Sequence, residues 1–351
     1  MSTYNDIRQA LAATGQPHHT LPIQNGVRLL FTEYGSRVMP FLAEDTPCLY
    51  WLNPVLWDAA ALRDFIAAGE WNMGGERMWI APEIQFNIHD RTDFWGTHRV
   101  PREIDPGMYR MLTIGGQVHF SQQVGLQAYN TATGTLYVDM RRTVQQIANP
   151  LRHTTQFDDL MTDVQFAGYA QTATMSILGG DSMYAETWNL IQLNAGGTLF
   201  IPSGGEGAVR YFGDPADDAM TTRNGAYRLH LTGQQQYKMG YKAAFLSGRM
   251  GYLNQTPDGT HYLFVRQFNN DPTTVYAEEP PDSPGVQGHS VHVYNDGGQF
   301  GGNAEMEANG RTIGGDTGQT TMTDTYNMWM FFSSSDIPLR RIGQALMGID
   351  L

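Results

Sequence analysis

The stretch GGERMWIAPE at residues 74–83 places two side chains that can bind a sugar close together. After the two glycines, Arg77 and Trp79 alternate onto the same face of a predicted strand. A guanidinium donates hydrogen bonds to hydroxyl groups, and an indole covers the apolar face of a pyranose ring. The pair therefore indicates a sugar site; the alternative is a core tryptophan beside an arginine paired with Glu83.

A second stretch, AETWNLIQL at residues 185–193, predicts another strand with a mixed polar and aromatic face. Trp188, Leu190 and Gln192 share that face because strand side chains alternate. An amide among aromatic rings is a suitable anchor for a sugar hydroxyl. Gln192 can equally be a buried glutamine whose hydrogen bonds are satisfied within the protein.

The sequence also carries a carboxylate pair late in the chain. Glu305 and Glu307 share one face of a predicted strand, as His292 and Tyr294 do on the strand before it. Paired carboxylates are costly unless they meet water, a cation or a ligand, and one of them can serve as a general base. The alternative is a solvated edge strand. Lys238, on a strand rich in aromatic residues, either reaches the same groove or extends to water.

Several kinds of site are not expected. The histidines lack the spacing of a metal-ligand set, and the glycine-rich stretches lack the lysine and hydroxyl residue of a phosphate loop, so we expect no metal and no cofactor. Cys48 is the single cysteine, and its apolar neighbours indicate a buried thiol. The net charge of −13 disfavours nucleic acid and acidic membranes as partners and leaves neutral sugars suitable.

The elements that must position these residues are mostly strands. Charged residues are only 16% of the chain and glycines number 39, which favours strands and turns over helices. Helical spacing is limited to residues 3–13 and 53–68. Strands are expected at residues 26–32, 36–41, 78–81, 117–129, 135–142, 169–178, 226–231, 262–268, 291–294 and 304–307.

These elements predict an all-β fold of large antiparallel sheets with short N-terminal helices. We expect residues 1–20 to form a helical extension and residues 21–351 a single sandwich domain. The N-terminus lacks the basic and apolar regions of a signal peptide, and no stretch reaches the roughly 18 apolar residues of a membrane span. The expected location is the cytoplasm, or the periplasm or exterior if a leader has been removed.

Together, residues 74–83, 186–202 and 294–310 resemble a group of uncharacterised bacterial proteins related to aldose 1-epimerases, in the galactose mutarotase-like superfamily. The stretch YKMGYKAAF at residues 237–245 also resembles that group. Order and spacing match from about residue 20 onward. The resemblance implies a supersandwich with a concave groove that binds a mono- or oligosaccharide.

The resemblance also implies roles for individual residues. In galactose mutarotases a late glutamate removes the proton of the anomeric hydroxyl, a histidine protonates the ring oxygen, and an arginine holds the sugar. The glutamate falls on Glu307, with Glu305 as the near alternative, and the arginine falls on Arg77. Residues 186–192 correspond to the histidine motif but contain no histidine. His119 or His292 would then supply the proton from another strand.

Three functions remain open from the sequence. The favoured one is an aldose 1-epimerase-like enzyme that acts at or near the anomeric carbon, with Trp79 or Trp188 as the stacking platform. The second is a lyase or glycoside hydrolase that cleaves an oligosaccharide in the same groove. The third is a binding protein without catalysis.

Overall fold

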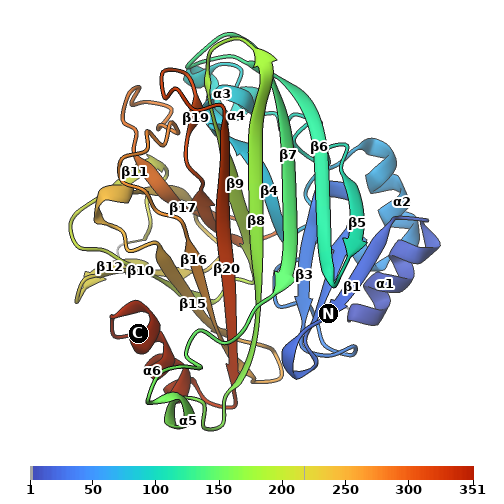
Figure 1. The fold of residues 1–351 in the computed structure, drawn as a ribbon, viewed down its shortest axis with the longest axis vertical. Coiled ribbons are helices and arrows are strands. Elements are labelled where there is room, and N and C mark those ends of the chain that lie inside the picture. The colour runs from blue at the N-terminus through green and yellow to red at the C-terminus, as the bar shows by residue number, and fades with distance from the viewer. Residues whose placement is uncertain (1–2, 217) are drawn as a thin grey trace.

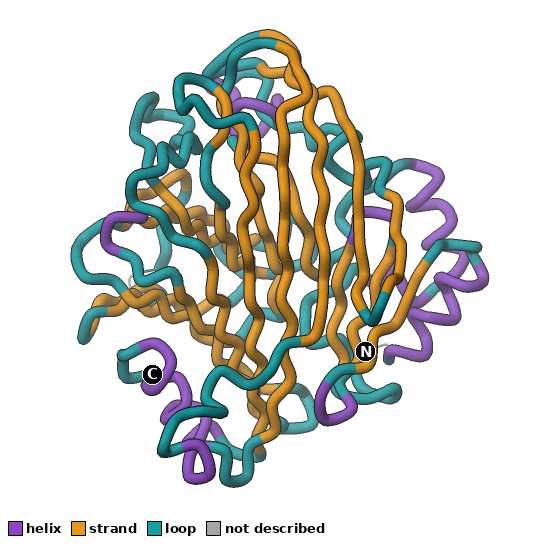
Figure 2. The backbone as a smooth tube through the Cα atoms, in the orientation of Figure 1, coloured by secondary structure: helices purple, strands orange, loops and turns teal. Residues whose placement is uncertain are grey.

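Two ten-stranded antiparallel sheets stacked face to face make up most of the structure, a computed structural model that describes residues 3–216 and 218–351 (Figures 1 and 2). In Figure 1 the second sheet, with β8 and β20, faces the viewer, and the first sheet, with β4 and β9, lies behind it. The expected all-β fold of large antiparallel sheets is confirmed.

The first sheet carries the strands on which most of the predicted site residues lie. Its strands run in the order β1 (His18–Pro22), β2 (Arg28–Thr32), β3 (Arg37–Phe41), β4 (Glu76–Ala81), β9 (Tyr184–Leu193), β18 (Ala304–Asn309), β17 (His289–Asp296), β14 (Gln236–Lys242) and β11 (Ala208–Phe212), and β19 (Ile313–Gly314) also pairs with β9.

The second sheet is built largely from long strands. Its order is β12 (Met220–Arg223), β13 (Ala226–Leu231), β10 (Gly197–Pro202), β15 (Arg249–Gln255), β16 (His261–Phe268), β20 (Thr321–Ser333), β8 (Gln165–Gly180), β7 (Gly134–Gln146), β6 (Gln117–Ala128) and β5 (Arg110–Ile114). Each strand expected from the sequence coincides with one of these or with a strand of the first sheet.

The helices are short and lie outside the sheets. They are α1 (Tyr4–Ala13), α2 (Ala59–Ala68), α3 (Glu83–Phe86), α4 (Phe94–Thr97), α5 (Phe157–Leu160) and α6 (Asp336–Met347), with 3₁₀ turns η1 (Gln24–Gly26), η2 (Tyr34–Ser36), η3 (Pro54–Trp57), η4 (Arg91–Asp93) and η5 (Ala243–Phe245). None of the helices in the described ranges is long and apolar enough to cross a membrane.

The helix expected over residues 53–68 is interrupted at Asp58. This residue has an extended backbone, and its carboxylate accepts hydrogen bonds from the amides of Ala60 and Ala61, so it ends η3 and caps α2.

The buried state expected for Cys48 is confirmed, and burial raises the pKa of its thiol.

A buried ion pair joins the two sheets through the hydrophobic core. Glu76 of β4 accepts a hydrogen bond from the Arg266 guanidinium of β16, and neither side chain is more than 1% exposed. Tyr169 and Gln171 of β8 also donate to the Glu76 carboxylate, as does Asn189 of β9 at 2.8 Å. A buried charge without such partners would cost several kcal/mol, so these contacts hold β4 and β9 against the second sheet.

Replacing Glu76 by glutamine should therefore destabilise the fold strongly. The E76Q variant leaves the Arg266 charge buried without its counter-ion, and we expect its free energy of unfolding to fall by about 3 kcal/mol or more. Urea unfolding of E76Q and of E44Q measures this. Glu44 pairs with Arg28 at 3.0 Å on the surface, so E44Q should cost less than about 1 kcal/mol. Equal stabilities of the two variants would contradict the role given to the buried pair.

Candidate functional site

The outer face of the first sheet collects the predicted site residues because its strand register aligns them. Arg77 of β4 lies opposite Leu190 of β9, and Trp79 lies opposite Trp188. Leu190 in turn lies opposite Glu307 of β18. Residues paired across antiparallel strands have their side chains on the same face. The arginine, the two indoles and the carboxylate therefore lie together although the sequence separates them widely.

The same register extends the site to the next two strands. Glu305 lies opposite Tyr294 of β17, and Glu307 lies opposite His292. Tyr294 lies opposite Lys238 of β14. The strand pairing thus places the lysine beside the two carboxylates, as the alternation of residues on each strand requires.

One pocket is lined by eight of the eleven residues that the sequence singled out: Arg77, Trp79, Glu83, Trp188, Lys238, Tyr294, Glu305 and Glu307. Leu190, which was expected on the same strand face as Trp188, also lines it. The other lining residues were not expected from the sequence: Trp71, Phe94, Trp95, His98, Phe212 and Phe300. The pocket is therefore mainly aromatic, with charged groups on its floor. Such a surface suits a ligand that has both an apolar face and hydroxyl groups.

Two carboxylates hold the indole rings in place. The Trp79 Nε1 donates to Asp105 Oδ2 at 2.8 Å, and the Trp188 Nε1 donates to Glu307 Oε2 at 2.9 Å. The two rings meet edge to face with their centroids 5.5 Å apart. The Arg77 guanidinium stacks on the Trp79 ring, 4.3 Å from its centroid. Because each ring is fixed at its N–H, the aromatic wall is rigid before a ligand arrives.

Charges of opposite sign are paired within the pocket. The Arg77 Nη2 donates to Glu305 Oε1 at 2.8 Å, and the Lys238 Nζ donates to Glu83 Oε2 at 2.7 Å. The Lys238 Nζ also lies 3.5 Å from Glu307 Oε2. Two cations thus face three carboxyl groups. No three Asp, Glu, His or Cys side chains in the described parts of the chain are arranged to hold a metal ion.

The carboxyl groups of the pocket have different proton affinities. Burial raises the pKa of Glu307 to about 7, and the neighbouring Glu305 and Glu83 add to this rise while Lys238 opposes it. Burial acts in the same sense on Glu83, but Lys238 and His98 outweigh it and hold the pKa of Glu83 at about 2. The Oε1 of Glu307 is buried and has no hydrogen-bond partner among the described residues. Glu307 can therefore take up or release a proton near neutral pH.

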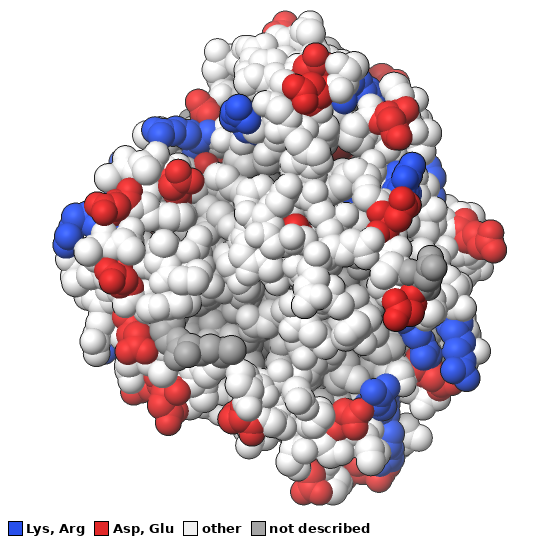
Figure 3. All heavy atoms as spheres, turned by 180° about the vertical axis from the view of Figure 1, so that it is seen from behind, with Lys and Arg blue, Asp and Glu red and all other residues white. Residues whose placement is uncertain are grey.

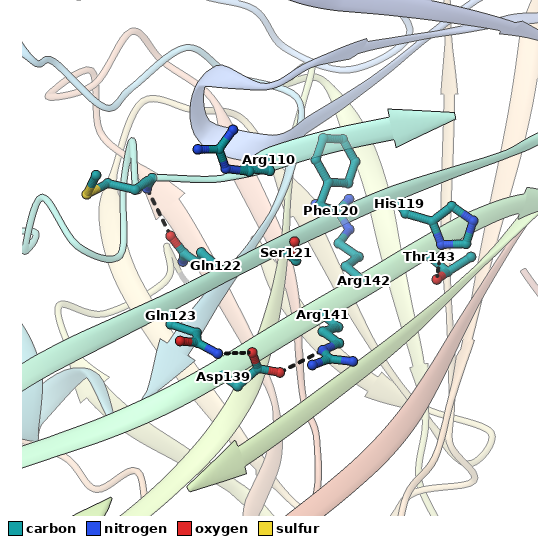
Figure 4. A pocket seen from close by; sticks show the side chains of 11 residues that line it. Arg110, His119, Phe120, Ser121, Gln122, Gln123, Asp139, Arg141, Arg142 and Thr143 are labelled. Atoms are coloured by element: carbon teal, nitrogen blue, oxygen red, sulfur yellow. Dashed lines mark hydrogen bonds and ion pairs between the residues drawn. The ribbon is translucent and has the colours of Figure 1, made fainter. Parts of the chain in front are cut away.

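The structure does not bring His119 to this pocket. His119 lies on β6 of the second sheet, where its Nδ1 is 3.0 Å from the Thr143 hydroxyl oxygen. It faces a separate pocket with Arg110, Ser121 and Arg141 (Figure 4). The alternation on β6 fixes the face on which His119 lies, but its distance from Glu307 depends on which sheet contains β6.

His292 and Gln192 lie on the same face of the first sheet as the pocket but do not line it. The His292 Nε2 is 3.1 Å from the Tyr211 hydroxyl oxygen. Burial, together with the charge of Lys238, lowers the pKa of His292 well below its usual range, so it stays neutral. The Gln192 Nε2 donates to Asn72 Oδ1 at 3.0 Å. These two residues support the site from its edge.

The remaining wall comes from residues 90–98, which the sequence analysis did not select. This segment contains η4 and α4 and carries Phe94, Trp95 and His98. The Phe94 and Trp95 rings lie 5.4 and 5.0 Å from the ring of Phe212 on β11. An Asp-capped turn that contains two adjacent aromatic residues and a histidine was the available signal in the sequence.

The pocket is small. Its free volume is about 40 Å³, room for a few water molecules but far below the roughly 300 Å³ at which ligand pockets begin. On the face opposite to that of Figure 1, charged side chains gather at the rim and the centre is mostly uncharged and hollowed (Figure 3). The β4, β9 and β18 walls belong to a sheet, whereas Phe94 and Trp95 belong to a short exposed turn. A sugar ring needs more room than this, and we expect the turn to move when one enters.

A thiol placed inside the pocket should report this movement without a ligand. In the C48A/L190C variant the new thiol replaces a buried pocket residue, so iodoacetamide should react with it slowly. Adding F94A and W95A should raise the reaction rate by about tenfold or more, because the aromatic contacts that close the pocket are lost. Adding F245A, which removes an exposed aromatic ring elsewhere, should leave the rate unchanged. Equal rates in all three variants would contradict a closure by this turn.

Comparison with solved structures finds proteins that share little sequence with this chain. Its structure is similar to a candidate aldose 1-epimerase from Klebsiella pneumoniae subsp. pneumoniae MGH 78578, at 7% identity and a TM-score of 0.44 over 95% of this chain and 84% of that one. It is also similar to an aldose epimerase homologue from C. elegans, at 8% identity and a TM-score of 0.39 over 90% of this chain and 98% of that one.

A candidate mutarotase from Salmonella typhimurium is similar at 8% identity and a TM-score of 0.38, over 89% of this chain and 90% of that one. No curated protein sequence matches the chain. A family model, in contrast, matches residues 24–351. The chain therefore belongs to the family of unknown function DUF6786.

Proposed function

We propose that this chain is an enzyme that binds a neutral monosaccharide and interconverts its two anomers, as an aldose 1-epimerase does. The observation that carries the proposal is the state of Glu307. It is a buried carboxyl group with a free oxygen, its pKa is about 7, and it lies beside Trp188 on the floor of an aromatic pocket. A base whose pKa lies near the working pH is the most effective proton acceptor.

The reaction requires two proton transfers. Glu307 takes the proton of the anomeric hydroxyl, the bond between C1 and the ring oxygen breaks, and the ring oxygen accepts a proton from an acid. The open-chain aldehyde then turns about its C1–C2 bond, and the reverse transfers close the ring with the opposite configuration. Arg77 and Glu305 suit the hydroxyl groups, because the guanidinium donates and the carboxylate accepts.

The pairing of charges supports a neutral ligand. Arg77 is matched by Glu305, and Lys238 is matched by Glu83. A charged group on the ligand would disturb one of these buried pairs, at a cost of several kcal/mol. Hydroxyl groups and an apolar ring face fit the same surface without that cost.

The shape of the pocket supports a single sugar ring over an oligosaccharide. The free volume of about 40 Å³ would have to grow far less for one ring than for several, and Phe94 and Trp95 pack against Phe212 in its wall. An enzyme that cleaves oligosaccharides needs an open groove with several subsites. The lyase, the hydrolase and the non-catalytic binding protein therefore remain alternatives that no contact in the pocket favours.

Polarimetry with freshly dissolved α-D-glucose, α-D-galactose and α-D-xylose tests the proposal. The wild-type protein should accelerate the approach to anomeric equilibrium for at least one of these sugars. The E307Q variant should lose about 100-fold or more of kcat, because glutamine cannot accept the proton. The same variant should still bind the sugar and raise its own Tm in a thermal-shift measurement.

The E44Q variant is the control, because Glu44 lies on the surface in a pair with Arg28 and should leave the rate unchanged. A wild-type protein that accelerates none of the three sugars, or an E307Q variant as active as the wild type, would contradict the proposal. The first result rejects the reaction, and the second rejects only the base.

A further inference from the structure

His98 lines the same pocket as Glu307. It follows α4, and its backbone pairs with Ile88 in an isolated bridge that closes the base of the 88–98 segment. The His98 Nε2 lies 3.5 Å from Glu83 Oε1, and its ring is 5.9 Å from the Trp95 ring. Its side chain is 15% exposed, so it is sheltered but open to the pocket.

A fixed negative charge stands behind the His98 ring. The Glu83 Oε2 accepts a hydrogen bond from the Lys238 Nζ at 2.7 Å. The pKa of Glu83, about 2, keeps its carboxyl group ionised at any working pH. The backbone amides of Glu83 and Ile84 donate to the carboxylate of Glu278, which anchors the start of α3. A carboxylate in this place orients an imidazole.

Two other candidate proton donors are already engaged within the protein. The His292 ring is bound to Tyr211, and the Tyr294 hydroxyl donates to Asp296 Oδ1 at 3.0 Å. Among the residues that line the pocket in the described chain, His98 is the one histidine. No described residue forms a hydrogen bond with its Nδ1, so this atom is available to a ligand.

We infer that His98 is the catalytic acid of the site, with Glu83 and Lys238 as positioning residues. The inference rests on the proposed function and supplies the proton donor that it lacks. The His98 imidazolium gives its proton to the ring oxygen as the bond between C1 and that oxygen breaks, while Glu307 takes the proton of the anomeric hydroxyl. On ring closure Glu307 returns its proton to the new hydroxyl, and His98 recovers its own from the ring oxygen.

This assignment gives the turn at residues 90–98 a second role, besides lining the pocket with Phe94 and Trp95. His98 lies at the end of the segment that carries Phe94 and Trp95, so closure of the turn over a sugar would also bring the acid to the ring oxygen. Opening for entry and assembly of the catalytic groups are then one movement.

Replacement of His98 by glutamine tests the inference by polarimetry on the sugar that the wild-type protein turns over. The H98Q variant should lose about 100-fold or more of kcat with little change in KM, because glutamine keeps the polar contact but transfers no proton. The H89Q variant is the matched control: His89 lies on the same segment, is exposed and stacks on Tyr129 outside the pocket, so its kcat should equal that of the wild type.

The E83Q variant gives a readout that a structural role would not change. The kcat should fall in E83Q and recover in part in E83D, because aspartate keeps a carboxylate toward Lys238 and His98 whereas glutamine does not. H98Q with wild-type kcat beside an inactive E307Q would overturn the inference and leave the proposed function standing. No turnover of any sugar by the wild-type protein would overturn both.

Discussion

The pair between Glu76 and Arg266 is the constraint on which the geometry of the site depends. A carboxylate in the core of a sandwich is tolerated only where donors meet it, and here they come from both sheets. Glu76 and Arg77 are consecutive on β4 and point to opposite faces. Fixing the carboxylate between the sheets therefore also fixes the guanidinium on the outer face, and Asn189 does the same for Trp188 on the neighbouring strand.

The site is a consequence of how strands carry side chains. Five neighbouring strands each contribute alternate residues to one face, so the arginine, the indoles, the carboxylates and the lysine are held by backbone pairing rather than by loops. Against this rigid floor stands one short turn. The sheet holds Arg77, the carboxyl groups and the two indoles, while Phe94, Trp95 and His98 come from the turn.

Much of this arrangement could be predicted from the sequence, and the missing parts have physical reasons. Period-two alternation placed Arg77 with Trp79 and Glu305 with Glu307, and the structure confirms each pair on a strand face. Which strands become neighbours is decided by contacts far apart in the chain, so His119 could not be assigned to the second sheet. His98 depends on the path of a turn, for which hydrophobic periodicity gives no signal.

Helix signals were less well used. The cap at Ser335 and the spacing of Leu339, Ile342 and Leu346 define α6, whose apolar side packs on the second sheet. This helix was not among those expected from the sequence, although the Ser335 cap and the apolar residues three and four positions apart were both present. Asp58 shows the converse case, in which a side chain that caps one helix interrupts a longer predicted one.

The most direct test of the account is the protonation of Glu307 itself. Carbon-13 NMR of the glutamate-labelled wild-type protein, with E307Q to identify the signal, follows that carboxyl group between pH 4 and 9. Burial beside Glu305 and Glu83, against the opposing charge of Lys238, predicts a titration midpoint near 7. A midpoint close to the ordinary glutamate value of about 4.3 would contradict a base poised for proton transfer at neutral pH.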